Sequence, residues 1–278
     1  MSQQKYSTAQ ENGELVSVSQ VLSFLKEPRN SESDAAATAV LDAISRLVQD
    51  NEENCATFGA SPNFFHELIA VIRKHIASSS ICDHGLASIR YLCRYNDSIQ
   101  SQNNRNIAGL GASEISSVLV QILRLHGSSD EHVSSIAMRC IMYLTYDSAD
   151  NKMMFGKANA CAVISKILEL HAVRSEEVAE IGFRCIQSIA NNNMENVTYF
   201  GKTDASGVVS RVLKAHGLTK PKVAEAGLSA ITVLCLDERS NAKFGHAEVC
   251  DTVLLLLDKY LEVDEVVVQA GECMLCPP

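Results

Sequence analysis

One short pattern recurs five times along this chain at a nearly constant spacing. Each copy has an asparagine (a serine in the last), three further residues, a bulky apolar residue and a glycine. The bulky residues are Phe58, Leu110, Phe155, Phe200 and Phe244, spaced by 52, 45, 45 and 44 residues. A fixed period of this length is typical of solenoids built from helical repeats. It constrains the fold more than any local propensity does.

Two longer amphipathic segments follow each copy of the pattern. After Phe155 they read ACAVISKILELH and, beyond a polar turn, VAEIGFRCIQSI. Apolar residues at this spacing line one face of a helix. The chain is therefore predicted to be all-α, with about five repeats of three helices and a period of 44–45 residues.

The repeats set the expected domain organisation. Residues 1–12 are polar and aperiodic, which predicts a disordered tail. Residues 13–278 are predicted to form a single solenoid, with a partial capping repeat over 13–50 that Pro28 interrupts. Full repeats are expected to start near residues 54, 106, 151, 196 and 240. The longer spacing after Phe58 places about seven extra residues in an exposed turn at 95–105.

Composition excludes several classes of function. The net charge of −9 and the pI of about 5.4 argue against a nucleic-acid partner or an anionic membrane, both of which require a basic face. No apolar run approaches the 18 residues of a membrane span, and the first 14 residues lack the apolar core of a secretion signal. The cytoplasm, or the nucleus and cytoplasm together, is the expected location.

The ten cysteines follow the repeat. Cys140 and Cys185 share one repeat position, and Cys93 and Cys235 share another. Equivalent residues of stacked helices lie roughly 8–10 Å apart, beyond the reach of a disulfide. We expect reduced thiols that fill the core of a protein in a reducing compartment.

The three-helix period resembles the armadillo repeat, over about residues 13–276; HEAT repeats have two helices. The resemblance implies a right-handed armadillo-type α-solenoid. Its third helix reads V-x-x-x-G/A-L/F-x-x-I-x-x-L, and the small residues at its centre are Gly85, Ala137, Gly182, Gly227 and Gly271. Glycine inside a helix costs about 1 kcal/mol relative to alanine, so its recurrence predicts a neighbouring helix that leaves no room for a side chain.

One position departs from the armadillo pattern. The turn before the second helix usually carries glycine, and here it carries Glu114, Asn159, Asp204 and Glu248. Asparagine and aspartate are expected to cap the second helix, and glutamate to complement its dipole.

No enzyme, metal or cofactor motif is visible in the sequence. GxGxxG, GxxxxGK[ST], GxSxG and HExxH are all absent. A polar series ends the second helices, at His75, His126, His171, His216 and Tyr260. Zinc needs its ligands within about 2.1 Å, whereas equivalent residues of stacked helices lie roughly 8–10 Å apart. We therefore expect these histidines to bind helix-terminal carbonyls, with pH sensing as the alternative. The lone CxxC, Cys273 to Cys276, is expected to fill core or groove.

In armadillo proteins the third helices line a concave groove that holds an extended partner segment. In the nuclear-import adaptors this groove carries a tryptophan and, four residues later, an asparagine. The chain has no tryptophan. The positions aligned with the tryptophan are Ala87, Arg139, Arg184 and Ser229. Those aligned with the asparagine are Tyr91, Tyr143, Ser188 and Val233. The import-adaptor role is therefore not expected. The candidate groove residues are Tyr91, Arg139, Tyr143, Glu180, Arg184, Ser188, Glu225 and Ser229. The alternative is a solvated helix face with pairs such as Glu180–Arg184.

The function expected from this resemblance is non-catalytic binding of a protein or peptide, as a scaffold or adaptor. The alternative is a regulatory armadillo module of a larger protein, such as a multidomain kinase or GTPase regulator. Arg139 and Arg184 favour an acidic or phosphorylated segment. Lys152 and Lys202 are expected outside the groove. Val263, Val267, Ala270 and Met274 are expected to expose an apolar strip at the C-terminal end, which marks a contact site. We expect self-association through this end, or a continuation of the chain that covers it.

Overall fold

A computed structural model describes residues 15–94, 100–246 and 249–274, and these contain helices and no strands. They form two compact units that divide between Val118 and Leu119. The predicted all-α fold is confirmed. The predicted tail, residues 1–12, lies outside the described residues. The single solenoid over 13–278 stays a prediction.

The first unit holds the helices up to the start of α7. They are α1 (Val18–Leu25), the 3₁₀ helix η2 (Pro28–Ser31), α2 (Asp34–Val48), α3 (Glu52–Ala60), α4 (Phe64–Lys74), α5 (Ser79–Cys93), α6 (Gln100–Gly111) and α7 (Ile115–His126). Ser33 caps α2 by accepting a hydrogen bond from the backbone N–H of Ala36. The turn predicted at 95–105 is partly wrong, since residues 100–105 belong to α6.

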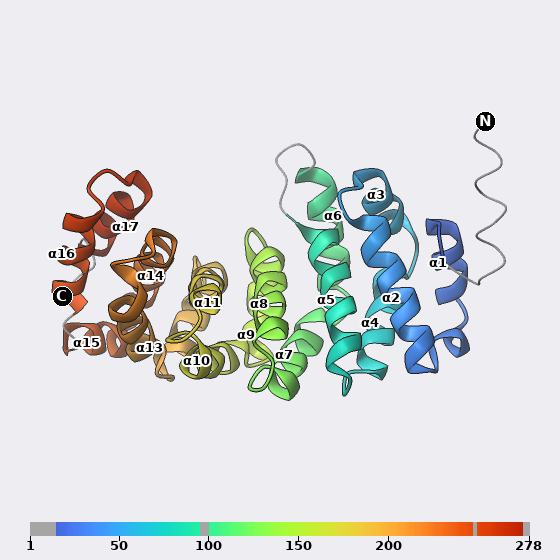
Figure 1. Ribbon diagram of the computed structural model, residues 1–278, viewed down its shortest axis with the longest axis horizontal. Helices are drawn as coiled ribbons and strands as arrows, with labels where there is room; N and C mark the ends of the chain where they lie inside the picture. Colours follow the sequence, from blue (N-terminus) through green and yellow to red (C-terminus); the bar gives the residue numbers. More distant parts are fainter. Residues whose placement is uncertain (1–14, 95–99, 247–248, 275–278) are drawn as a thin grey trace. The chain divides into compact units, whose positions relative to one another are not determined.

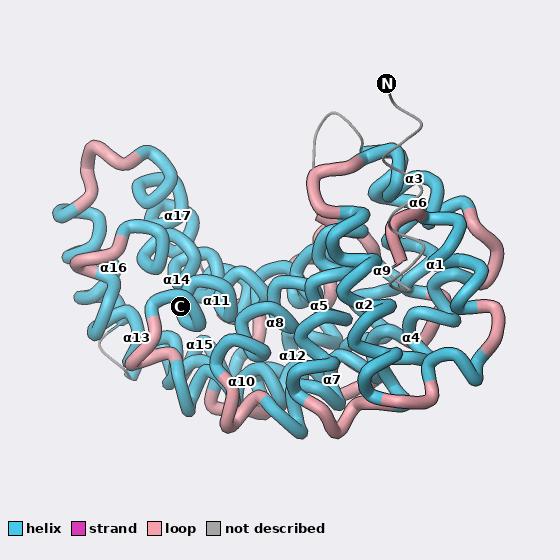
Figure 2. The backbone as a smooth tube through the Cα atoms, turned by 45° about the vertical axis from the view of Figure 1, so that its right-hand side comes forward, coloured by secondary structure: helices cyan, strands magenta, loops and turns pink. Residues whose placement is uncertain are grey.

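The second unit holds the rest of α7 and three complete three-helix repeats with a further third helix. Its helices are α8 (Glu131–Thr145), α9 (Ala149–Lys157), α10 (Ala160–His171), α11 (Glu176–Ala190), α12 (Met194–Gly201), α13 (Ala205–Val212), the π-helix η4 (Leu213–Gly217), α14 (Pro221–Leu234), α15 (Glu238–His246), α16 (Val249–Lys259) and α17 (Asp264–Met274). In Figures 1 and 2, α10 and α13 line the lower edge of the unit, and α11, α14 and α17 lie above them.

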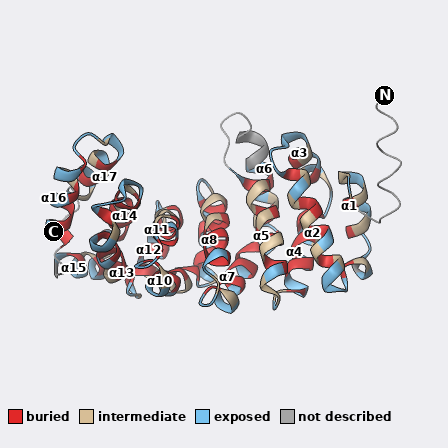
Figure 3. Ribbon diagram, viewed as in Figure 1, coloured by how far each residue is buried: buried red, intermediate tan, exposed pale blue. Residues whose placement is uncertain are grey.

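The core of the second unit comes from the apolar stripes of these helices. Phe155, Phe183 and Phe200 are fully buried. In Figure 3 buried residues, in red, run along α8 and α11, and exposed residues, in pale blue, gather at the turns. Because each repeat contacts only its neighbours, burial at a given position depends on the repeat that follows it.

The glycines of the third helices admit side chains of the second helices, as predicted. A Cβ atom at Gly85 would lie 2.7 Å from Ile72, and one at Gly227 would lie 2.5 Å from Leu213. At Gly182 it would overlap Leu168. The prediction fails only at Gly271, where a Cβ atom would have no described atom within 4 Å.

The asparagine that opens each repeat anchors it to the preceding helix. Its amide donates to a backbone carbonyl near the end of that helix, at 2.7–3.1 Å. The pairs are Asn54 with Leu47, Asn106 with Leu92, Asn151 with Leu144, and Asn196 with Ile189. These carbonyls have no partner within their own helix. The asparagine is thus a structural link between repeats.

The turn before the second helix corrects one expectation. Neither Asn159 nor Asp204 makes a side-chain capping hydrogen bond. Asn159 and Glu114 instead adopt left-handed backbone conformations, with φ of 68° and 62°. Glycine tolerates this conformation best and asparagine next best. These residues therefore occupy the usual glycine position at some cost in strain.

Candidate protein-binding surface

Seven of the eight predicted groove residues lie on three third helices of the second unit. Arg139 and Tyr143 are on α8, Glu180, Arg184 and Ser188 on α11, and Glu225 and Ser229 on α14. Neighbouring third helices pack side by side along the unit. We call the solvent-facing side of α8, α11 and α14 the third-helix face. Tyr91 lies on α5 in the first unit, where the Arg90 guanidinium is 4.6 Å from its ring centroid.

Arg184 is the centre of this face. Its Nη1 and Nη2 atoms donate to the two carboxylate oxygens of Glu225 at 3.2 and 2.6 Å, across to the next repeat. Its Nε donates to Glu180 at 3.2 Å, one turn earlier on α11. The Glu180–Arg184 pair considered from the sequence is therefore present. The fork with Glu225 adds directional specificity, because both bonds are fixed by the planar guanidinium.

The environment of Arg184 raises the pKa of its side chain. Burial alone would lower the pKa of Arg184, but the hydrogen bonds and charges of Glu225 and Glu180 outweigh burial and raise that pKa. All three side chains remain 24–29% exposed. The cluster is therefore an ion-paired network at the surface that a ligand can still reach.

Arg139 has a weaker partner. Its Nη2 lies 3.6 Å from Glu177 Oε1, and its side chain is 29% exposed. Tyr143, one turn later on α8, is half-buried. Arg139, Arg184, Glu177, Glu180 and Glu225 together carry two positive and three negative charges. These five side chains therefore carry a net negative charge, although Arg139 and Arg184 taken alone favour an acidic or phosphorylated segment.

Two predicted contact residues face inward. Ser188 is buried; its hydroxyl lies 2.8 Å from Thr145 Oγ1 and donates to the Met142 carbonyl at 3.0 Å. Ser229 is also buried and donates to Gln269 Oε1 on α17 at 2.5 Å. Both side chains join neighbouring third helices, so their role in the structure is to hold the face together.

Lys152 and Lys202 were expected outside the groove. Lys152 lies on the first helix α9, where its side chain is only 7% exposed. Its ammonium donates to the Asn191 carbonyl at 2.8 Å, and burial lowers the pKa of Lys152. Lys202 is exposed, as expected.

Four members of the polar series at the second-helix ends bind backbone carbonyls, as predicted, and these carbonyls belong to the preceding repeat. His171 Nε2 bonds the Gly127 carbonyl at 2.8 Å, His216 Nε2 bonds that of Val173 at 3.0 Å, and the Tyr260 hydroxyl donates to that of Gly217 at 2.8 Å. In the first unit His75 bonds Ser31 and Asp34. Within the described ranges, no three His, Cys, Asp or Glu side chains are grouped to hold a metal.

The structure also bears on the cysteines and on membrane spans. No disulfide joins the nine cysteines that fall within the described residues. In the same part of the chain no single helix is long and apolar enough to cross a membrane. The helices at 104–111 and 115–126, bent by 75°, meet that test only as a pair.

Solved structures resemble this chain over most of its length. A designed armadillo repeat protein matches with a TM-score of 0.72 at 18% identity, over 93% of this chain and 98% of that one. The chain has the armadillo-repeat fold. A second designed armadillo repeat protein, solved with the peptide (KR)4, matches with a TM-score of 0.68 at 18% identity, over 90% and 98%. An engineered protein from a structural genomics consortium gives 0.72 at 13% identity, over 94% and 98%.

Sequence comparisons are silent by contrast. No protein-family model matches the chain, and no curated protein sequence matches it.

The sequence missed three residues that shape the third-helix face. Glu177 pairs with Arg139, and Thr145 and Gln269 hold Ser188 and Ser229. Each lies one repeat away from its partner, about 40 residues along the chain. Aligning the repeats shows that Glu225 is equivalent to Glu180 and so makes it a candidate partner of Arg184, but the spacing of α11 and α14 decides whether the contact forms.

Proposed function

We propose that this chain is a non-catalytic binding module whose third-helix face holds an extended segment of a partner protein. The observation that carries the proposal is the Arg184 cluster, a partly exposed polar network in the middle of that face. Solenoids commonly bind through the surface that successive repeats share. The likeness to a designed armadillo protein solved with a peptide supports this use of the fold.

The chemistry of the cluster favours a basic side chain in the partner. Glu180 and Glu225 each accept from Arg184, and a carboxylate can accept several hydrogen bonds. A lysine or arginine of the partner would add to these acceptors and balance the extra negative charge. An acidic or phosphorylated group, which the sequence favours, would have to displace two carboxylates from Arg184 against their repulsion. The peptide (KR)4 in the designed protein is also basic.

Peptide binding by fluorescence anisotropy tests the proposal. The probes are labelled (KR)4, an acidic peptide of the same length, and a glycine–serine peptide. We expect (KR)4 to bind tightest, and Glu180→Gln with Glu225→Gln to weaken it at least tenfold. The matched control is Asp150→Asn with Glu169→Gln, two exposed acids elsewhere in the second unit, which should leave the affinity within about twofold.

Three results would contradict this account. Equal weakening by the control pair would indicate non-specific charge attraction. Tighter binding of the acidic peptide, lost in Arg139→Ala with Arg184→Ala, would restore the sequence-based partner class. Absence of binding to every probe would reject the third-helix face. Lys157→Ala with Lys202→Ala serves as the cationic control, because Lys152 is buried.

A further inference from the structure

A cavity lies on the last repeat, α15 to α17, beside the end of α14. The cavity measures about 1060 Å³ and is lined mainly by apolar side chains and thiols. Gly245 on α15, Cys250 and Leu254 on α16, and Met274 on α17 are among its lining residues, and all four are exposed. We call these four residues the end face.

In the earlier repeats the same positions are covered by the helices of the next repeat. Gly156 is equivalent to Gly245, and a Cβ atom there would overlap Asn196 of α12. Cys161 is equivalent to Cys250, and its thiol donates to the Asn196 carbonyl at 3.8 Å. At Gly245, in contrast, a Cβ atom would meet no described atom within 4 Å. The end face therefore occupies the place where a following helix packs.

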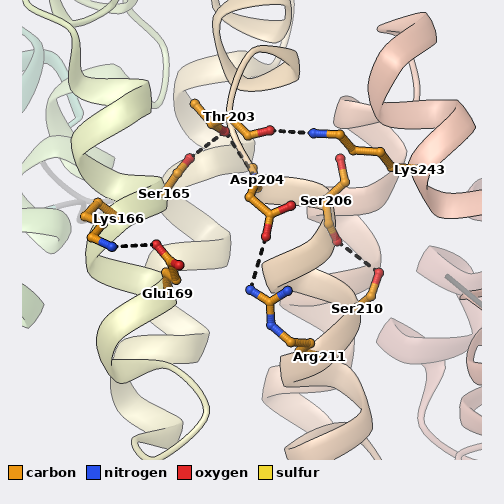
Figure 4. A network of polar contacts seen from close by, with 10 residues as sticks. Ser165, Lys166, Glu169, Thr203, Asp204, Ser206, Ser210, Arg211 and Lys243 are labelled. Carbon is orange, nitrogen blue, oxygen red and sulfur yellow. Dashed lines mark hydrogen bonds and ion pairs between the residues drawn. The ribbon is translucent and has the colours of Figure 1, made fainter.

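A position on the second helices is likewise covered by the next repeat in α10 and exposed in α16. Figure 4 shows Ser165 of α10 reaching Thr203 of the next repeat, 2.9 Å away, while Lys243 of α15 donates to the Thr203 carbonyl at 2.6 Å. The residue equivalent to Ser165 in the last repeat is Leu254, which is 55% exposed. Leu254 is much larger than serine. A helix seated on the end face must therefore lie further out than α12 does and make apolar contact.

The charge of the last repeat indicates which kind of partner the end face can bind. Residues 237–246 and 249–274 contain eight acidic and three basic side chains, a net charge of −5 with histidine neutral. Glu238 lines the cavity itself. Helices with one apolar side commonly bind in hydrophobic grooves through residues at i, i+3, i+4 and i+7. Cationic residues flanking the apolar side of such a helix would complement the net negative charge of this repeat.

We propose that the end face binds an amphipathic α-helix with basic flanks from a partner protein. The helix lies on the side of the last repeat where α12 and α15 pack on the two preceding repeats, but further out, with its apolar side against Leu254 and Met274. This site is separate from the third-helix face and uses a helical partner where that face uses an extended one.

The expected apolar strip at this end is corrected in detail. Ala270 is fully buried, and Val263 and Val267 are half-buried. Of the four residues predicted, only Met274 is exposed. The exposed apolar side chains that accompany it are Leu254, Leu255, Leu261 and Val268.

A synthetic 14-residue leucine–lysine amphipathic helix is the probe, with a leucine–glutamate peptide of the same apolar pattern beside it. Calorimetry should show one leucine–lysine peptide bound per chain, at least tenfold tighter than the leucine–glutamate peptide. Gly245→Phe fills the cavity and Leu254→Glu opposes the apolar contact; each should weaken binding at least tenfold. Both sites are exposed, so the fold should persist, as circular dichroism would verify. Leu170→Glu, at an exposed leucine of α10, is the matched control and should not change binding.

Several outcomes would overturn this proposal. Loss of binding in the Leu170→Glu control, or unchanged binding in both end-face variants, would show that the peptide binds elsewhere. Equal affinity for the two peptides would refute the basic partner. A concentration-dependent dimer in sedimentation that Gly245→Phe abolishes would assign the end face to a second copy of this chain. Competition by (KR)4 would merge this site with the third-helix face, whereas independent binding keeps the two proposals separately testable.

Discussion

The third complete set of helices, α9 to α11, and the last set, α15 to α17, follow one sequence pattern but differ in how their residues are buried. Phe183 on α11 is fully buried and lies 3.2 Å from the position a Cβ atom would take at Gly227 on α14. Its equivalent on α17 is Glu272, which is exposed. The comparison teaches that a repeat position acquires its environment from the following repeat as much as from its own helix.

Cysteine reactivity should show the largest difference between the two sets. Cys161 is buried, and burial raises the pKa of its thiol to about 12, whereas its equivalent Cys250 is exposed. At pH 8 a thiol with that pKa is ionised in about one molecule in 10⁴, and the thiolate is the reactive form. Mass spectrometry after labelling with a disulfide reagent should give a rate at least about 10³-fold lower at Cys161. Similar labelling rates at Cys161 and Cys250 would contradict the difference in burial between the two thiols.

Truncating equivalent side chains should separate the two sets in stability. Phe183→Ala leaves a cavity in a close-packed core and should reduce the free energy of unfolding by about 3–5 kcal/mol. Glu272→Ala alters a surface position and should change it by no more than about 0.5 kcal/mol. Urea denaturation followed by circular dichroism measures both. Comparable losses would mean that Glu272 is as deeply engaged as Phe183.

Replacing glycine by alanine should change the stability of the protein in opposite directions in the two sets. Gly182→Ala forces the new Cβ atom into Leu168 and should destabilise by about 1–3 kcal/mol through overpacking. Gly271→Ala meets open space among the described atoms and should stabilise α17 by up to about 1 kcal/mol. Thermal melting of the two variants tests the sign. A stabilised Gly182→Ala protein would contradict the close approach of α10 and α11.

The residue that opens each repeat gives the smallest effect. Asn196 donates to the Ile189 carbonyl, whereas the buried Ser240 hydroxyl, at the equivalent position, has no hydrogen-bond partner among the described residues. Asn196→Ser should cost about 1 kcal/mol, and Ser240→Asn should gain about 0.5–1.5 kcal/mol by restoring the bond. The shift in urea midpoint between these two variants is the readout. A destabilised Ser240→Asn protein would show that the last repeat cannot accept the link.

The sequence predicted the elements that depend on local periodicity. The third helices and the small residues at Gly85, Gly182 and Gly227 follow from spacing and side-chain size alone. The inward-facing Ser188 and Ser229 and the buried Lys152 could not be predicted this way. Their environments depend on partners one repeat away, and the exact rotation of each helix decides which side chains reach water.

The Arg184 cluster shows the same limit. The i,i+4 pair with Glu180 is visible in the sequence, because it depends on helical spacing. The fork with Glu225 requires knowing how far α14 lies from α11. That single contact changes the expected charge of the partner from acidic to basic.

Native-state hydrogen exchange reports how far the local stability of each helix depends on the helices packed against it. Core helices exchange only through large openings, and terminal elements open locally at lower free energy. Amides of α11, covered on both sides by α8 and α14, should be protected at least about 100-fold more than those of α17. Equal protection of α11 and α17 would contradict the account, because the last repeat would then be as well covered as the third.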